Sequence, residues 1–213
     1  MYTEKHNGGK RKLINAAYIL LTAVFIFLFI MPTPGTNVLE EWELYFSSIS
    51  SGAKKSLLEY QCDTASGACQ ITGIGSYKEN KLTVPQYIGE YRVTSIGDGA
   101  FKNQFSITYA EIPSTVAIIG NEAFRSCNNL IEVNVADGTM RIGTNAFAYC
   151  NNLRTISLPA SLTSIGNYAF HSCTKLSSIK FGGTKAHWLK LSENTRWNAN
   201  GSHCTVICSD GVL

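Results

Sequence analysis

The chain has 213 residues, and apolar side chains make up 45% of them, which is an ordinary share for a globular protein. Its formal net charge is only +3, and residues 1–31 carry that whole excess, so the rest of the chain is neutral. Because residues 32–213 carry no net charge, nucleic acid is not the expected partner. We therefore expect one globular domain with attached segments.

The first landmark is an uninterrupted apolar run from Leu13 to Met31, which contains no charged residue. As a helix it would span about 28 Å, close to the thickness of the hydrocarbon core of a bilayer. Basic residues precede it at 10–12, so the positive-inside rule places residues 1–12 in the cytoplasm as a basic tail. We expect residues 13–31 to be a transmembrane signal anchor that leaves the rest of the chain outside the cytoplasm. The alternative is a cleaved signal peptide and a secreted protein.

Residues 32–56 follow as a predicted juxtamembrane helix and linker. Asn37 and Glu40 have the spacing of a capping box, and apolar residues then recur at near-helical intervals. Packing against the first repeat is one interpretation of this helix, and lying at the membrane surface is the other. The run Ser47–Gly52 is typical of a short flexible linker.

Residues 57–95 are predicted to form an N-terminal cap and an entry repeat. Two strands, from Leu57 to Cys62 and from Cys69 to Ile74, flank a polar turn. A repeat array needs such a cap because its first unit would otherwise expose an apolar edge. Cys62 and Cys69 could form a disulfide across this hairpin if the domain lies outside the cytoplasm, or both could remain free thiols.

Residues 96–181 contain an internal repeat with a period of 23 residues. The motif I-G-x-x-A-F begins at Ile96, Ile119, Ile142 and Ile165. Further columns share this period, and one repeat reads L-x-x-I-x-L-(P)-x-x-L-x-x-I-G-x-x-A-F-x-x-C-x-x. A period of this length is typical of stacked-repeat proteins.

Two parts of the repeat predict two kinds of local structure. The I-x-L part alternates apolar and polar residues, as a half-buried strand does. The A-F-x-x-C part has apolar residues at helical spacing and predicts a short helical turn. Neither part can bury its apolar side alone, so stacked neighbours must supply the core. We predict an α/β repeat solenoid with N- and C-terminal caps, the second cap covering residues 182–213.

The repeat resembles the BspA-like leucine-rich repeat, a family of surface proteins in bacteria and some parasitic protists. The similarity covers roughly residues 60–213. It is clearest in the units that run through Leu130–Pro159 and Leu153–Phe181, and it is looser around Ile107–Pro113, where Gln104 replaces the cysteine. The resemblance implies a short leucine-rich-repeat solenoid, a cell-surface setting and roles in adhesion or in contact with hosts or neighbouring cells. It implies no particular ligand.

No set of side chains in the sequence predicts catalysis, a cofactor or a metal centre. Cys127, Cys150 and Cys173 occupy one repeat position inside an apolar pattern, and we expect them to be small buried side chains. His203 precedes Cys204, yet the sequence shows no orienting partner or oxyanion donor for a nucleophile. We therefore expect a protein that is not an enzyme and needs no cofactor.

The candidate ligand surface is the outward face of the predicted strands. In each I-x-L strand, the residues on either side of the central apolar residue point away from the core. These residues are Tyr109, Glu111, Glu132, Asn134, Thr155, Ser157, Ser178 and Lys180. Solenoids bind partners on extended concave faces, so we expect a protein or a glycan ligand on the concave face here.

Together these features predict a membrane-anchored cell-surface leucine-rich-repeat protein that mediates protein or glycan binding. The alternative is a structural subunit whose solenoid packs constitutively against another membrane or envelope protein. Both hypotheses use the same strand surface, and they differ in whether the partner is resident or is encountered.

Overall fold

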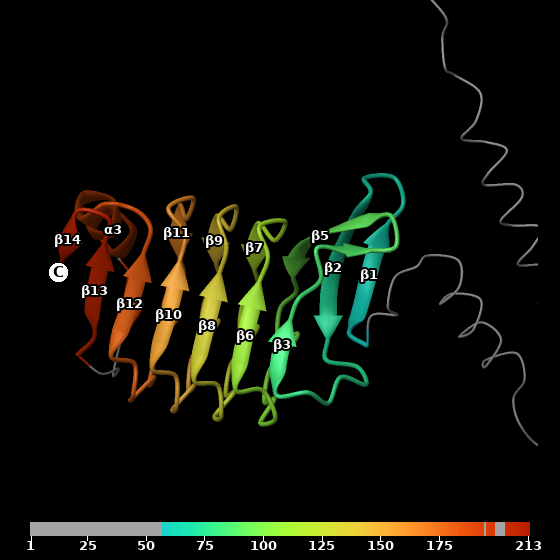
Figure 1. Ribbon diagram of the computed structural model, residues 1–213, viewed down its shortest axis with the longest axis horizontal. Coiled ribbons are helices and arrows are strands. Elements are labelled where there is room, and N and C mark those ends of the chain that lie inside the picture. Colours follow the sequence, from blue (N-terminus) through green and yellow to red (C-terminus); the bar gives the residue numbers. More distant parts are fainter. Residues whose placement is uncertain (1–56, 194, 199–202) are drawn as a thin grey trace, which may run out of the picture. The chain divides into compact units, whose positions relative to one another are not determined.

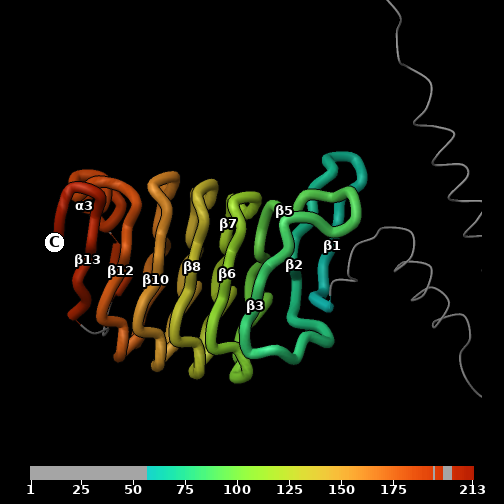
Figure 2. The backbone as a smooth tube through the Cα atoms, in the orientation of Figure 1, coloured from blue at the N-terminus to red at the C-terminus, as the bar shows by residue number. Residues whose placement is uncertain are grey.

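The computed structural model describes residues 57–193, 195–198 and 203–213. The predicted basic tail, transmembrane anchor and juxtamembrane helix all lie outside these ranges. Within the described ranges, no helix is both long and apolar enough to cross a bilayer. Figure 1 shows the repeat domain as a ribbon and Figure 2 shows its backbone as a tube, with the C-terminus at the end opposite strand β1 (Glu59–Asp63).

The domain is built on two seven-stranded sheets. Sheet A contains β1 and the strands β2 (Ala68–Gly73), β4 (Tyr87–Ile88), β5 (Tyr91–Ile96), β7 (Ile118–Ile119), β9 (Arg141–Ile142) and β11 (Ser164–Ile165). Sheet B contains β3 (Lys81–Thr83), β6 (Tyr109–Ile112), β8 (Glu132–Val135), β10 (Thr155–Leu158), β12 (Ser178–Phe181), β13 (Thr205–Cys208) and β14 (Gly211–Val212). Paired strands are parallel except in the pairs β1–β2, β4–β5 and β13–β14.

In neighbouring strands of successive repeats, residues at the same position of the repeat lie side by side. In sheet B, Ile156 of β10 lies beside Val133 of β8 and Ile179 of β12. In sheet A, Ile142 of β9 lies beside Ile165 of β11. Each repeat thus adds one strand to each sheet, and the chain is a β-solenoid of stacked turns. The strand in sheet A was not predicted, because only the I-x-L part of the repeat alternates over enough residues.

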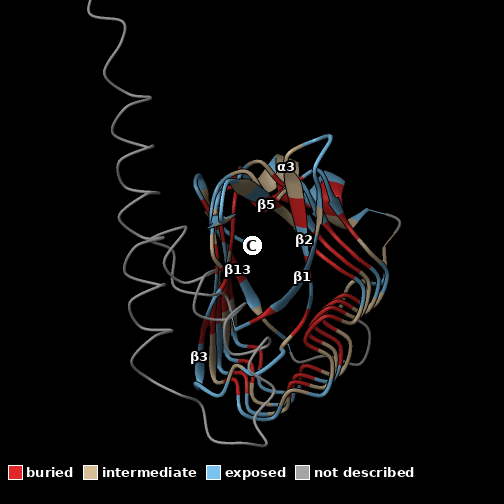
Figure 3. Ribbon diagram, turned by 90° about the vertical axis from the view of Figure 1, so that its right-hand side faces the viewer, coloured by how far each residue is buried: buried red, intermediate tan, exposed pale blue. Residues whose placement is uncertain are grey.

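The inward side chains form one continuous hydrophobic core. Its centre is a stack of fully buried phenylalanines, one from each I-G-x-x-A-F motif: Phe101, Phe124, Phe147 and Phe170. The centroids of successive rings lie 5.0, 5.1 and 5.5 Å apart. Viewed along the domain axis, the buried segments of successive repeats lie behind one another (Figure 3). Full burial of one such ring contributes about 1.5–3 kcal/mol, so the stack is a main source of cohesion between repeats.

The A-F-x-x-C segment is not helical, so that prediction was wrong. It forms turns, and within the described residues only α3 (Lys185–Ser192) is an α-helix. Two positions in each segment have positive φ, for example Asn145 at 55° and Tyr149 at 63°. An α-helix needs φ near −63° at every residue, so these positions interrupt it. The backbone bonds from one repeat to the next instead, as where Phe124 N–H donates to Ala146 O at 2.7 Å.

These segments form a third side of the solenoid, which we call the turn side: residues 97–104, 120–127, 143–150 and 166–173. Its three cysteines are buried, and each thiol donates a hydrogen bond to a phenylalanine carbonyl oxygen of the preceding repeat. Cys173 Sγ, for example, lies 3.1 Å from Phe147 O. Burial raises the pKa of the Cys150 thiol well above its ordinary value, and it raises the pKa of Cys173 to about 12. The thiols of Cys150 and Cys173 therefore remain protonated donors at neutral pH.

The hairpin of β1 and β2 closes the N-terminal end of sheet A. Cys62 lies opposite Cys69 in the antiparallel register, and a disulfide joins them. Strand β2 then pairs in parallel with β5 and continues sheet A into the repeats. The hairpin thus takes the place that a preceding repeat would occupy.

The C-terminal cap, within residues 182–213, closes the other end of the core. Trp188 of α3 packs against Phe181 and Trp197, with ring centroids 5.3 Å apart in both pairs. Trp197 in turn meets Phe170 at a centroid distance of 6.1 Å and so ends the phenylalanine stack. Strand β13 pairs with β12 and covers the last repeat strand of sheet B.

Candidate functional site

All eight residues of the predicted ligand surface lie on the outer face of sheet B, which we call the strand face. Each strand places two of them outward, on either side of a buried residue. They form one row of Tyr109, Glu132, Thr155 and Ser178, and a second row of Glu111, Asn134, Ser157 and Lys180. Because neighbouring strands lie about 4.8 Å apart, each row of four is about 15 Å long.

The strand face is longer than the sequence predicted. Lys81 of β3 extends the first row beside Tyr109, and Thr205 of β13 extends it beside Ser178. The repeat period misses both residues, because each cap contains an irregular insertion relative to the repeat. The alternation within the short K-L-T and T-V-I triplets was the only available signal.

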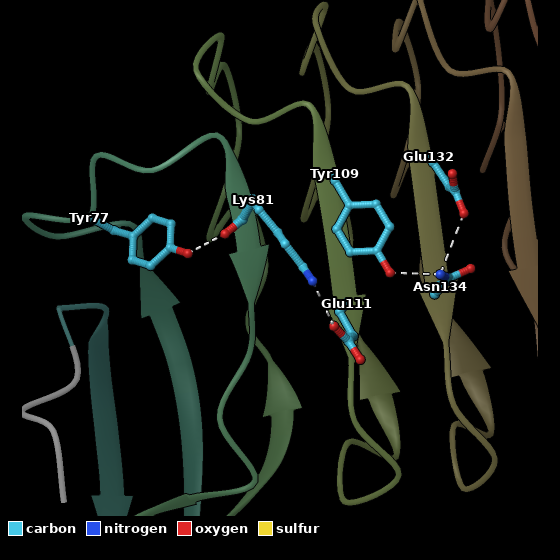
Figure 4. Close-up of polar contacts among 6 residues, drawn as sticks. All are labelled: Tyr77, Lys81, Tyr109, Glu111, Glu132 and Asn134. Atoms are coloured by element: carbon cyan, nitrogen blue, oxygen red, sulfur yellow. Dashed lines mark hydrogen bonds and ion pairs between the residues drawn. The ribbon is translucent and has the colours of Figure 1, made fainter.

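Tyr109 is held by side chains from its two neighbouring strands, β3 and β8 (Figure 4). Asn134 Nδ2 donates a hydrogen bond to Tyr109 Oη at 2.7 Å and lies 3.5 Å from the carboxylate of Glu132. Lys81 Nζ lies 5.0 Å from the centroid of the Tyr109 ring and 3.7 Å from the carboxylate of Glu111. The exposed ion pair contributes less than about 1 kcal/mol, so its main effect is to position the lysine beside the ring. Tyr109 is therefore presented in a defined orientation.

The other half of the strand face has short hydroxyl side chains and one long basic side chain. Thr155, Ser157 and Ser178 are half-buried, whereas Lys180 is exposed. The half around Tyr109 has two glutamates and one lysine, so the two halves carry opposite net charge. Such a face can orient a ligand that has complementary charges at its two ends.

The strand face offers groups for binding, namely an aromatic ring, hydroxyls, an amide and charged ends. The histidines that the structure describes lie elsewhere: His171 on the turn side, His187 in α3 and His203 shortly before β13. Within the described ranges, no cluster of three or more His, Cys, Asp or Glu residues could hold a metal ion.

Known proteins share this repeat and this fold. Residues 94–190 match the BspA type leucine rich repeat region in six copies, and no curated protein matches the chain. A leucine-rich repeat protein of T. pallidum has 28% sequence identity and a TM-score of 0.57, over 60% of this chain and 59% of that one. A leucine-rich repeat protein from Bacteroides capillosus ATCC 29799 has 26% identity and a TM-score of 0.55, over 62% of this chain and 98% of that one. The repeat region of this chain belongs to the BspA type of leucine-rich repeats.

Proposed function

We propose that this domain binds a protein partner through the strand face. The observation that carries the proposal is the fixed position of Tyr109, which Asn134 and Lys81 hold from the two adjacent strands. Tyrosine is enriched among residues that dominate binding energy at interfaces. A side chain that is already ordered in the free protein loses little conformational entropy when a partner binds.

The charges of the strand face give the proposed partner a polarity. Glu111 and Glu132 favour a basic group on the partner, and Lys180 favours an acidic group near the other end. The length of the two rows of outward residues suits an extended segment or a loop of that partner, since the rows cross several strands. A glycan remains the alternative ligand, and the test below separates the two.

In this proposal the domain lies outside the cytoplasm, held at the cell surface by residues 13–31 as a signal anchor. The Cys62–Cys69 disulfide supports an oxidising compartment, because structural disulfides persist outside the cytosol. The role that follows is adhesion to, or contact with, a host or a neighbouring cell.

Site-specific photo-crosslinking in intact cells of the source organism tests the proposal. A photoreactive amino acid replaces Thr155 at the middle of the strand face. The matched control replaces Met140, whose side chain is 50% exposed and which precedes β9 of the other sheet.

The expected result is a discrete protein adduct from position 155 that position 140 does not give, and that appears only with host matrix or neighbouring cells. A constant adduct in pure culture would instead identify the domain as a subunit of a resident complex. A glycan adduct, or equal adducts from both positions, would contradict protein binding through the strand face.

A further inference from the structure

The turn side carries a cluster of aromatic side chains that the strand face does not involve. Tyr149 and Tyr168 both lie edge-on to His171, with ring centroids 5.1 and 5.6 Å away. The two tyrosines come from successive repeats, and the histidine shares a repeat with Tyr168. Backbone hydrogen bonds link the three, because Tyr149 N–H donates to His171 O at 2.8 Å and His171 N–H donates to Tyr168 O at 3.0 Å.

Both tyrosines occupy positions that favour smaller residues. Their φ angles are 63° for Tyr149 and 60° for Tyr168, in the left-handed region. The matching positions of the other repeats hold Asn103, Ser126 and Ser172 for Tyr149, and Gly99, Glu122 and Asn145 for Tyr168. A bulky residue in this region costs on the order of 1 kcal/mol, whereas glycine and asparagine tolerate it. The other repeats hold no aromatic side chain at these two positions, so the cluster is a local feature of the turn side and not a part of the repeat motif.

Basic side chains continue the cluster in both directions along the turn side. The Arg125 guanidinium lies 5.4 Å from the centroid of Tyr149, and its Nη1 is 2.9 Å from Glu122. Lys102 Nζ lies 2.7 Å from the same carboxylate. At the other end, Arg196 Nη1 is 3.5 Å from the hydroxyl of Tyr168. This strip of the turn side, from Lys102 to Arg196, has three basic side chains against the carboxylates of Glu122 and Asp98 and so keeps one net positive charge.

We propose that this strip is a second binding site, for a glycan that carries carboxylate or sulfate groups. The aromatic rings offer apolar surface to the C–H face of a sugar ring, and the tyrosine hydroxyls offer hydrogen bonds to its hydroxyl groups. The guanidinium groups match the planar geometry of acidic substituents. The strip crosses several turns of the solenoid at about 4.8 Å per turn, so it suits an extended polymer.

The test uses a variant that borrows residues from the chain's own repeats. Tyr149→Ser, Tyr168→Asn and His171→Ala together insert the residues found at Ser126, Asn145 and Ala148, which occupy the matching positions. Because these residues suit the local backbone, the variant should unfold at or near the temperature of the unaltered chain. A second variant, Tyr149→Phe, keeps the ring.

Binding of the full chain is measured by calorimetry with heparin as the sulfated probe, hyaluronan as the carboxylated probe and dextran as the neutral control. We expect binding to at least one acidic glycan and none to dextran. The triple variant should bind at least about tenfold more weakly, and Tyr149→Phe should bind within about threefold of the unaltered chain.

The control Lys78→Ser removes one positive charge at an exposed position between β2 and β3, outside both the strand face and the turn side, and should leave glycan binding unchanged. The proposal is overturned if the unaltered chain binds neither acidic glycan, or if the folded triple variant binds as tightly as the unaltered chain. It is also overturned if Lys78→Ser weakens binding as much as the triple variant does, since charge alone would then explain binding. None of these results depends on whether the strand face binds a protein.

Discussion

The hydroxyl of Tyr77 donates a hydrogen bond to the backbone carbonyl oxygen of Lys81, on the side of β3 that faces away from β6 (Figure 4). The opposite side of β3 is paired with β6, as shown by Val84 N–H, which donates to Glu111 O at 3.0 Å. The Tyr77 phenol therefore occupies a carbonyl acceptor on the open edge of sheet B. Exposed strand edges invite pairing between chains, and natural proteins block them.

Tyr77→Phe should open this edge while keeping the ring. We expect a loss of about 1 kcal/mol in the free energy of unfolding, because the Lys81 carbonyl oxygen loses its partner. We also expect self-association that grows with protein concentration. Urea unfolding and light scattering at several concentrations measure the two effects. Tyr87→Phe, at a tyrosine that is 54% exposed, is the control and should change neither. A monomeric Tyr77→Phe variant of unaltered stability would show that the edge is blocked by something else.

Gly143 lies where the backbones of successive turns approach each other closely. A Cβ atom at this position would lie 2.6 Å from the backbone nitrogen of Asn121, closer than real Cβ contacts. At Gly97, in the first repeat, the nearest atom would be 3.1 Å away. Gly143→Ala should therefore force two backbone segments apart and cost about 3 kcal/mol or more, whereas Gly97→Ala should cost about 1 kcal/mol. Urea unfolding of both variants checks the order, and equal losses would refute the close-approach argument.

The sequence shows that a glycine recurs at one position of every repeat, but it does not show that a side chain there would collide with the preceding turn. The period of 23 residues places Gly97, Gly120, Gly143 and Gly166 in register, and the outward residues of sheet B followed from alternation. The turn side could not be predicted, because Ala146, Phe147 and Cys150 have the spacing of a helix and the left-handed residues beside them differ in type from repeat to repeat. The aromatic cluster was missed for the same reason: Tyr149 is remote in sequence from His171, and only the stacking of turns brings them together.

The buried thiols should make the fold less stable in alkaline solution. Cys173 has its pKa raised by burial from 9.0 to about 12, so the folded state keeps a proton that the unfolded state releases above pH 9. The stabilising effect is fully present below pH 9 and is lost as the pH rises towards 12. One such thiol should cost about 1.4 kcal/mol of unfolding free energy per pH unit in this window. Cys173→Ala removes this dependence, so its stability should fall less between pH 8 and pH 10 in urea titrations. Parallel pH curves for both chains would contradict the assignment.

A chain that ends at Gly182 should fail to fold. The backbone N–H groups of Tyr168 and Phe170 donate to carbonyl oxygens in the lost segment, at 3.0 and 2.7 Å, and β12 pairs with the lost β13. Each buried group left without a partner costs about 1–3 kcal/mol, and the last phenylalanine ring would also face water. These losses together approach the whole stability of a small domain, about 5–15 kcal/mol.

A milder change in the full chain isolates the aromatic part of this cap. Trp197→Ala removes the ring that lies 6.1 Å from Phe170 and 5.3 Å from Trp188, and it should cost about 1–3 kcal/mol. Leu189→Ala, at an exposed position of α3, is the control and should stay within about 0.5 kcal/mol of the unaltered chain. Circular dichroism during urea unfolding measures the free energy of unfolding of both variants.

Hydrogen exchange locates the part of the domain that the Trp197→Ala substitution destabilises. Because a solenoid repeat contacts only its neighbours, loss of Trp197 should speed exchange at the Tyr168 and Phe170 amides more than at the Phe124 amide. Uniform acceleration along the whole array would mean that the cap stabilises the domain as one cooperative unit.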